Sequence, residues 1–362
     1  MTTMDRPDRL AAAFEERGID ALLVTNLVNV RWLTGFSGSN GLALVGPAGQ
    51  RLFLTDFRYL TQSAEQVDAG WRREIAQEIL HAAATFVGSD GAAVRLGFDD
   101  ASMSVKDHAT LAGKLADGVA LVPAGGLIEE LRLVKDADEQ AKIRAAAKLA
   151  DAALSEVLSR GLAGRTEREV GLDLEVTMRK AGAEAVSFPP IVASGEHSAL
   201  PHAEPRDVVI PKNTLVTIDW GAQLDGYASD CTRTYATGPD LDPRDREVYE
   251  IVLTAQLESL AAVRAGVGGR EVDAIAREVI TAAGHGEHFG HGLGHGVGAE
   301  VHEGPRLSQR SEATLAVGQV VTVEPGIYVP GAIGVRIEDL AIVTEDGSDV
   351  LTSLPKDLQI ID

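Results

Sequence analysis

The chain has 362 residues, 45% of them hydrophobic and 24% charged, and this balance excludes disordered, collagen-like and coiled-coil proteins. Its length exceeds the size at which one hydrophobic core keeps growing, which favours two domains. With 54 acidic against 33 basic residues the formal net charge is −21, so most of the surface would repel nucleic acid and anionic membranes.

The cysteine content and the amino-terminal sequence indicate the cellular compartment of the protein. Cys231 is the one cysteine in the sequence, so the chain cannot form an internal disulfide. Residues 1–10 lack the apolar segment of a secretory signal peptide, and the apolar run at 21–24 is too short to cross a membrane. The sequence therefore predicts a cytoplasmic protein without a membrane-spanning segment.

The first 130 residues have the pattern of an α/β domain. Apolar residues recur at helical spacing from Leu10, and Gly18 follows as a stop signal, which predicts a helix over residues 8–18. Short apolar or alternating runs, separated by Gly, Pro, Asn and Ser, predict strands. The predicted strands cover residues 19–25, 41–45, 51–55, 95–98 and 119–122.

A change of pattern near residue 130 marks the predicted domain boundary. From Asp136 onward, apolar residues lie on one helical face until Gly161 ends the pattern, which predicts a long amphipathic helix. Further helices are predicted over residues 167–181, 244–265 and 271–283, with strands in most of the remainder. The chain is therefore expected to consist of two domains that mix helices and strands, residues 1–130 and residues 131–362.

The segment 215–234 predicts a β-hairpin that brings two aspartates together. Asp225-Gly226 is a strong turn signal between two alternating runs, and a two-residue turn there places Asp219 and Asp230 diagonally on one face. Two carboxylates converging on an apolar hairpin repel each other, and a cation between them offsets this most simply. The alternative is that one aspartate caps a strand or pairs with Arg233.

The segment 285–302 is rich in histidine and glycine. Its glycine density forbids a stable helix, so His291 and His295 do not form the helical histidine pair of a zinc peptidase. The glycines instead permit close approach of the backbone to a substrate or an ion. The alternative is that such histidines are incidental, and this is the favoured interpretation for His285 and His288.

The segment 320–343 contains two apolar β-like runs that carry charged residues. Glu324 ends the first run, and Arg336 and Glu338 lie within the second, where a glutamate is unusual. Because Arg336 and Glu338 are two residues apart, they are expected to share one face of the sheet. An ion pair between them is the alternative to a functional site.

Taken together, these segments supply two aspartates, two glutamates and at least one histidine. Four carboxylates balance the charge of two divalent ions, and a carboxylate-dominated set favours Mn²⁺, with Co²⁺ or Zn²⁺ as alternatives where imidazole joins. The cysteine count excludes an all-thiolate zinc site.

These motifs resemble those of the metallopeptidases that comprise methionine aminopeptidase, aminopeptidase P and prolidase (Xaa-Pro dipeptidase). The resemblance is strong over residues 138–362 and looser over residues 29–40, which are similar to the amino-terminal domain of the proline-specific branch. It implies a creatinase-like α/β domain followed by an α+β pita-bread catalytic domain. The residues that look like the five metal ligands are Asp219, Asp230, His295, Glu324 and Glu338, with Asp230 and Glu338 bridging both ions.

The same resemblance implies the roles of several neighbouring side chains. His202, His291 and His302 look like the histidines that line the substrate cleft and contact the scissile amide, and Arg336 looks like their arginine partner. Glu324 is the candidate proton shuttle, and His202 or His302 would stabilise the oxyanion. Because a prolyl nitrogen has no N–H in the peptide, the site must select the ring by shape, through apolar walls near His291 and Val301.

The sequence thus predicts a cytoplasmic Xaa-Pro dipeptidase that acts on short proline-containing peptides and, as the resemblance implies, forms a homodimer. Xaa-Pro aminopeptidase (aminopeptidase P) is a nearly equal alternative. A pita-bread scaffold that only binds a partner, and creatinase-like amidino hydrolysis without metal, are disfavoured because all five ligand positions are present. An enzyme based on Cys231 is disfavoured because Cys231 points to the face opposite Asp230.

Overall fold

The computed structural model describes residues 4–46, 49–87 and 93–362, so the first three residues of the segment predicted to lack an export signal lie outside it. Contacts divide the chain into two compact units, Met1–Arg132 and Leu133–Asp362.

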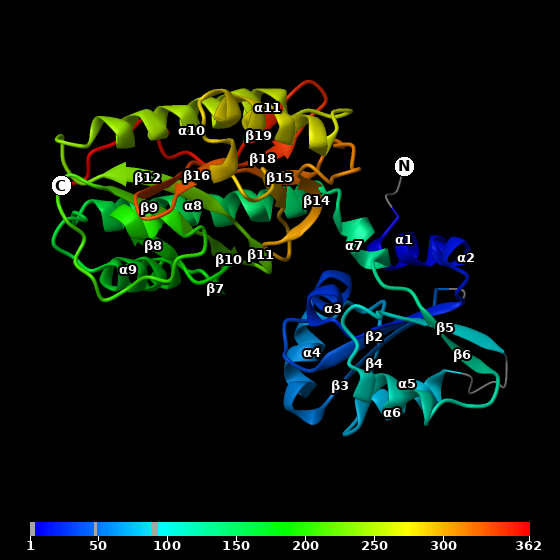
Figure 1. Ribbon diagram of the computed structural model, residues 1–362. Coiled ribbons are helices and arrows are strands. Elements are labelled where there is room, and N and C mark those ends of the chain that lie inside the picture. Colours follow the sequence, from blue (N-terminus) through cyan, green and yellow to red (C-terminus); the bar gives the residue numbers. More distant parts are fainter. Residues whose placement is uncertain (1–3, 47–48, 88–92) are drawn as a thin grey trace. The chain divides into compact units, whose positions relative to one another are not determined.

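A mixed six-stranded sheet forms the centre of the described part of the first unit, in the order β4-β3-β2-β1-β5-β6 (Figure 1). Five of these strands are predicted from the sequence, whereas β4 is polar and exposed and carries no apolar alternation. The strands are β1 Ala21–Val24, β2 Gly41–Val45, β3 Arg51–Thr55, β4 Arg72–Ile75, β5 Val94–Phe98 and β6 Val119–Pro123.

Helices cover both faces of this sheet. One core cluster packs α1, α3 and α7 against it, and a second packs α5 and α6 against the other face. The helix predicted over residues 8–18 is split at Ala13 and ends at Gly18, whose φ of 65° is the left-handed conformation that favours glycine. The helices are α1 Arg6–Ala12, α2 Phe14–Arg17, α3 Leu27–Thr34, α4 Leu60–Gln66, α5 Ile79–Phe86, α6 Val105–Ala112 and α7 Leu127–Arg132, with a 3₁₀ turn η2 Phe57–Tyr59.

Four long helices frame the second unit, close to where the sequence predicts them. They are α8 Ala137–Leu158, α9 Glu167–Lys180, α10 Pro243–Ala262 and α11 Gly269–Ala282. Capping boxes explain why α8 begins after Asp136 and α9 after Thr166, because each cap side chain accepts the N–H of a glutamate three residues on. Figure 1 shows α10 and α11 running along one side of the strands.

Strands of four small sheets lie between these helices. One core cluster joins α10 and α11 to β15–β18, and another joins α8 and α9 to β8, β9 and β12. In the described residues the sheet orders are β11-β10-β7, β12-β9-β8, β14-β13-β15-β18-β19 and β16-β17. The strands are β7 Ala185–Val186, β8 Ile191–Ser194, β9 Leu215–Trp220, β10 Ala222–Leu224, β11 Tyr227–Ala228, β12 Cys231–Ala236, β13 Gly294–Gly296, β14 Glu303–Leu307, β15 Val320–Val323, β16 Gly326–Val329, β17 Ile333–Arg336, β18 Asp339–Val343 and β19 Ser348–Val350, with 3₁₀ turns η3 Gly195–Ala199 and η4 Gly286–His288.

The predicted hairpin register is confirmed. Leu224 pairs with Tyr227 across the Asp225-Gly226 turn, and both turn residues have positive φ. The same register continues into β9 and β12, where Asp219 lies opposite Thr232. Asp230 therefore lies diagonally across from Asp219, as the pattern predicts.

One strand prediction is wrong in detail. The apolar run around Arg336 and Glu338 is not one strand but two, because β17 ends at Arg336 and pairs with β16, whereas β18 begins at Asp339 and pairs with β15. Glu338 therefore lies at a change of sheet and belongs to neither ladder.

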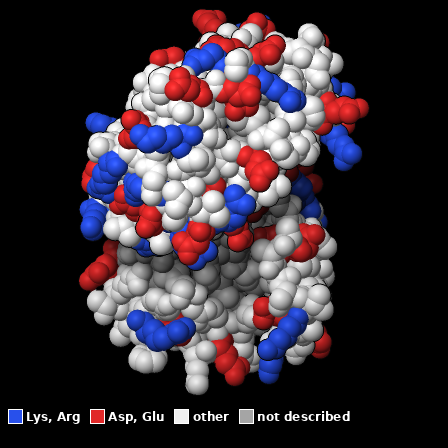
Figure 2. Space-filling model, turned by 60° about the vertical axis from the view of Figure 1, so that its left-hand side comes forward, with Lys and Arg blue, Asp and Glu red and all other residues white. Residues whose placement is uncertain are grey.

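In the part of the chain that the structure describes, no helix has the length and apolar character needed to cross a membrane. On the face drawn in Figure 2, acidic and basic side chains are interspersed rather than gathered in one continuous patch of either sign.

Candidate metal centre

A cavity of about 510 Å³ in the second unit brings the candidate residues together. All nine side chains singled out from the sequence line it, although they come from five separated segments. They are His202, Asp219, Asp230, His291, His295, His302, Glu324, Arg336 and Glu338.

Three carboxylates meet at one point of this cavity. One oxygen each from Asp219, Asp230 and Glu338 lies within 4.8 Å of the other two. Burial and then the neighbouring charges of Glu338, Asp219 and Glu324 raise the pKa of Asp230 well above its usual range. Burial likewise raises the pKa of Glu338, with Glu324 and Asp219 adding to the effect. Without a cation, these groups cannot all carry their charge at neutral pH.

His295 completes this cluster from β13. Its Nε2 lies 3.5 Å from Asp230 Oδ2 and 3.3 Å from Glu324 Oε1, and its Nδ1 lies 3.0 Å from the carbonyl of Gly296. Burial lowers the pKa of His295 to about 3, so the ring is neutral and Nδ1–H donates to that carbonyl. The Nε2 lone pair then faces two carboxylates, an arrangement that a cation among the three groups would make favourable.

Two buried oxygens support the same conclusion. Asp219 Oδ1 and Glu338 Oε1 have no hydrogen-bond partner among the described residues. Their other oxygens are held, because Arg336 Nη2 donates to Asp219 Oδ2 at 2.6 Å and Thr232 Oγ1 donates to Glu338 Oε2 at 2.8 Å. Buried carboxylate oxygens without donors are costly, and divalent cations are the partners that oxygen ligands accept. The donor set therefore fits divalent metal.

Glu324 differs from the other carboxylates. It follows β15, and its Oε1 accepts a hydrogen bond from Thr322 Oγ1 at 3.1 Å. Burial raises the pKa of Glu324 to about 7, against the opposing effect of Arg336.

Arg336 does not pair with Glu338, and neither aspartate pairs with Arg233. Arg336 contacts Asp219, and its Nη1 also donates to Tyr328 Oη at 2.7 Å. Both ion-pair alternatives considered from the sequence are therefore absent at these described residues. Arg336 is buried, so the ion pair fixes the orientation of Asp219.

The three cleft histidines differ in how tightly they are held. Both ring nitrogens of His291 have protein partners, because Nδ1 lies 2.8 Å from the Gly292 carbonyl and Nε2 lies 3.1 Å from Tyr328 Oη. His302 packs edge-on against His295, with ring centroids 4.5 Å apart. His202 and His302 are exposed to the cavity and have ring nitrogens available there. Contact with the scissile amide stays a prediction for all three.

The predicted apolar wall does not include Val301, and the sequence pointed neither to residues 188–191 nor to Arg306 as part of the cavity lining. Phe188, Pro189, Pro190 and Ile191 line the cavity, whereas Val301 packs against a core cluster instead. Arg306 also lines it and has no carboxylate partner among the described residues. The Phe-Pro-Pro run in front of β8 is a signal that could have marked a rigid apolar loop.

Cys231 lies away from this site. It is buried and forms no disulfide, its side chain packs in the core cluster of α8, α9, β8, β9 and β12, and it does not line the cavity that Asp230 lines. The expectation that Cys231 points away from Asp230 is therefore confirmed.

Comparison with known proteins bears on both units. The family described as metallopeptidase family M24 matches residues 141–345, and the creatinase/prolidase N-terminal domain matches residues 6–134. An Xaa-Pro dipeptidase of Pyrococcus furiosus is 37% identical, over 98% of this chain and 99% of that one.

Solved structures of similar proteins match this chain over nearly its whole length. An Xaa-Pro dipeptidase from Bacillus anthracis has a TM-score of 0.93 and 42% identity, covering 98% of each chain. An X-Pro aminopeptidase from Thermotoga maritima MSB8 has a TM-score of 0.90 and 36% identity, covering 99% of this chain and 100% of that one. The predicted fold class, a creatinase-like α/β domain followed by an α+β pita-bread domain, is confirmed by these matches.

Proposed function

The chain belongs to metallopeptidase family M24, and from that premise we propose that it hydrolyses the Xaa-Pro bond of dipeptides and other short peptides. The observation that carries the proposal is a single cavity in which a carboxylate and imidazole cluster adjoins an apolar wall. The relatives described as Xaa-Pro dipeptidases, which match this chain over nearly their whole length, support the same substrate class.

Membership of the family implies divalent metal, and the proposed cofactor is a pair of Mn²⁺ ions, with Co²⁺ or Zn²⁺ as alternatives. When bound, two divalent ions make a hydroxide available at neutral pH and polarise the scissile carbonyl. The residues proposed to hold them are Asp219, Asp230, His295, Glu324 and Glu338.

The side chains around the cluster carry the remaining steps of the proposed reaction. Glu324 accepts the proton of the attacking water at a carboxylate oxygen and delivers it to the departing prolyl nitrogen. His202 or His302 donates a hydrogen bond to the oxyanion that forms from the carbonyl. Arg336 keeps Asp219 oriented through their ion pair.

Recognition of proline is assigned to the apolar wall. Residues 188–191 present a phenylalanine, two prolines and an isoleucine to the cavity. Such a wall accepts a pyrrolidine ring by shape and requires no hydrogen bond from the nitrogen. This matches the chemistry of a tertiary amide, which has no N–H to offer.

Arg306 favours the dipeptidase over the aminopeptidase. Its guanidinium lines the cavity without a carboxylate partner among the described side chains. A dipeptide places a free carboxylate directly after the proline, whereas a longer peptide continues with an amide. An arginine pairs well with a carboxylate and gains much less from an amide.

Peptide hydrolysis by metal-stripped protein, with and without Mn²⁺, tests the proposal. We expect Mn²⁺-dependent cleavage of Ala-Pro and little cleavage of Ala-Pro-Ala or Met-Ala-Ser. Preferential cleavage of Ala-Pro-Ala would establish the aminopeptidase alternative. No hydrolysis of any peptide despite bound metal would contradict the peptidase and favour a scaffold that only binds a partner.

Arg306→Met gives a sharper test of the preference for dipeptides. We expect KM for Ala-Pro to rise roughly 10–100-fold, because a charge-assisted hydrogen bond contributes about 1.5–3 kcal/mol. The KM of Ala-Pro-Ala should change little. Arg310→Met makes the same substitution at an exposed arginine outside the cavity lining and should leave both constants as they are. An equal rise of KM for both peptides would show that Arg306 does not recognise the free carboxylate of the dipeptide.

The proposal extends to assembly, compartment and domain limits. We assign the protein to the cytoplasm as a homodimer, with domains over residues 1–130 and 131–362. The single, buried cysteine suits a reducing compartment. Light scattering coupled to size-exclusion chromatography checks the dimer, and limited proteolysis checks the domain limits through cleavage near residue 130.

A further inference from the structure

The backbone of Glu338 lies between two strands and is not paired in either β-ladder. Residue 336 ends β17, which pairs with β16, and residue 339 begins β18, which pairs with β15. Glu338 therefore belongs to neither ladder, although its carboxylate is part of the crowded cluster in the cavity. Something other than sheet pairing must hold this residue in position.

Two consecutive residues of β12 supply that support. The N–H of Glu338 donates to the carbonyl of Thr232 at 3.0 Å, and Thr232 Oγ1 donates to the Glu338 carboxylate at 2.8 Å. Arg233 Nη1 donates to the Glu338 carbonyl. The amide, the carboxylate and the carbonyl of Glu338 are thus all bound by Thr232 or Arg233.

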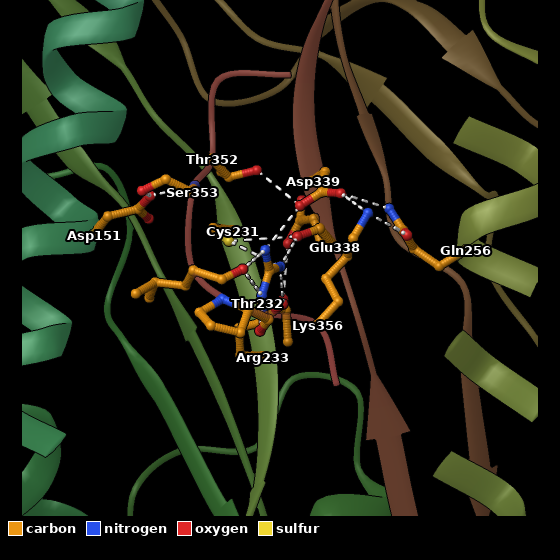
Figure 3. A network of polar contacts seen from close by, with 12 residues as sticks. Asp151, Cys231, Thr232, Arg233, Gln256, Glu338, Asp339, Thr352, Ser353 and Lys356 are labelled. Atoms are coloured by element: carbon orange, nitrogen blue, oxygen red, sulfur yellow. Dashed lines mark hydrogen bonds and ion pairs between the residues drawn. The ribbon is translucent and has the colours of Figure 1, made fainter. Parts of the chain in front are cut away.

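Arg233 is itself fixed from behind by the carboxyl-terminal segment. The guanidinium is 1% exposed and donates to the carbonyls of Leu354 and Pro355. It also pairs with Asp339 at 2.8 Å, and Asp339 in turn accepts from Thr352 at 2.8 Å and from Lys356 at 2.6 Å (Figure 3).

This arrangement lies behind the cavity rather than in it. Neither Arg233 nor Asp339 lines the cavity, because neighbouring residues of an extended chain alternate between faces. Arg233 therefore reaches Glu338 only through its backbone carbonyl. Figure 3 shows the Arg233 side chain lying among Asp339, Thr232 and Lys356.

We propose that Arg233 is a positioning residue for the metal centre, which holds Glu338 at the change of sheet and couples its position to residues 352–356. The inference rests on the proposed function, in which Glu338 binds metal. A guanidinium suits this role because its fixed fork binds the Glu338 carbonyl and the Asp339 carboxylate at the same time. A lysine keeps the charge but cannot make both contacts in that geometry.

Arg233→Lys tests the inference through metal binding rather than turnover. The affinity for Co²⁺ is measured by competition with a chromophoric chelator, and the visible spectrum of the Co²⁺-loaded protein reports the coordination geometry. We expect roughly 10–100-fold weaker binding, as found when groups that orient metal ligands are removed, together with a changed spectrum. Thermal unfolding of the metal-free variant shows separately how much stability is lost.

Arg165→Lys is the matched control. Arg165 likewise donates to a carboxylate, Asp173 at 2.8 Å, and to a backbone carbonyl, that of Gly161 at 3.3 Å. Among the described residues, none of its hydrogen bonds or ion pairs reaches a residue that lines the cavity. The Co²⁺ affinity and spectrum of this variant should match those of the parent protein.

A triple variant keeps the inference testable if Arg233→Lys does not fold. Arg233→Met with Asp339→Leu and Lys356→Met replaces all three charged members of the buried network by apolar side chains, a change that proteins often tolerate. We expect this variant to fold and to bind Co²⁺ as weakly as Arg233→Lys, because the contact to the Glu338 carbonyl is lost in both.

The outcomes separate this inference from the proposed function. If the parent protein binds Co²⁺ and both variants bind it equally well, Arg233 is structural only and the inference is overturned. If the parent protein fails to bind Co²⁺, or if Asp230→Asn binds it as the parent does, the proposed metal centre is wrong and the inference falls with it.

Discussion

Asp230→Asn is expected to lower kcat/KM for Ala-Pro on the order of 1,000-fold. Asp230 joins the carboxylate cluster with Asp219 and Glu338 and lies 3.5 Å from His295, so its charge is central to holding cations there. Polarisation by bound metal contributes several kcal/mol to catalysis, and each 1.4 kcal/mol corresponds to about tenfold in rate. Steady-state hydrolysis in excess Mn²⁺ measures the loss.

The same substitution should not destabilise the metal-free protein. It removes a buried charge that burial and three neighbouring carboxylates oppose, while the volume of the side chain stays nearly the same. We therefore expect metal-free Asp230→Asn to unfold at the same temperature as the parent or higher. Asp349→Ala, which removes an exposed carboxylate paired with Arg144, is the control and should leave activity unchanged. Full activity in Asp230→Asn would exclude Asp230 from the site.

The sequence was sufficient to predict those parts of the structure that local chemistry determines. The Asp225-Gly226 turn and a strict two-residue period fix the hairpin register, which brings Asp219 and Asp230 together. The start of α8 follows from the reciprocal contacts of Asp136 and Glu139. Each of the nine candidate side chains lies in a short motif that could be recognised separately from the others. All nine line one cavity.

Long-range arrangements were not predictable in this way. Residues 335–343 are apolar except for Arg336, Glu338 and Asp339 and contain no glycine or proline, so no turn residue marks the change of sheet. The support that Arg233 gives Glu338 joins residues about a hundred positions apart, and no periodicity connects them. The apolar wall at 188–191 lies largely in an irregular segment between β7 and β8, where pattern arguments have no period to use.

The change of sheet at Glu338 explains why Glu338 needs the support of Arg233. Arg336 and Glu338 are two residues apart and both line the cavity, so the break does not change the face that they share. What the break removes is the pairing that a ladder would give the backbone of Glu338. The consequence is that contacts from β12 must replace the missing ladder bonds.

Metal removal should destabilise the protein increasingly as the pH rises. Burial raises the pKa of Asp219, Asp230 and Glu338, and it raises that of Glu324 to about 7. A carboxyl group with a raised pKa in the folded state stabilises the fold fully below its unfolded pKa, near 4, and loses that contribution as the pH rises through the folded value. The metal-free protein should therefore lose stability from about pH 4 to pH 7 and beyond.

Bound metal reverses this trend, because it competes with protons for the same oxygens and binds more tightly as they leave. Metal at a hundred times its Kd stabilises by about 2.7 kcal/mol per site, which for a unit of this size raises Tm by roughly 5–10 °C. We expect that difference between Mn²⁺-loaded and chelator-treated protein near pH 7.5, and a much smaller one near pH 5. Calorimetric scans across this range measure it. Asp230→Asn should flatten the pH dependence of the metal-free protein, whereas Asp349→Ala should preserve it. A difference in Tm that stays constant with pH would mean that the cavity carboxylates are not the groups that bind the metal.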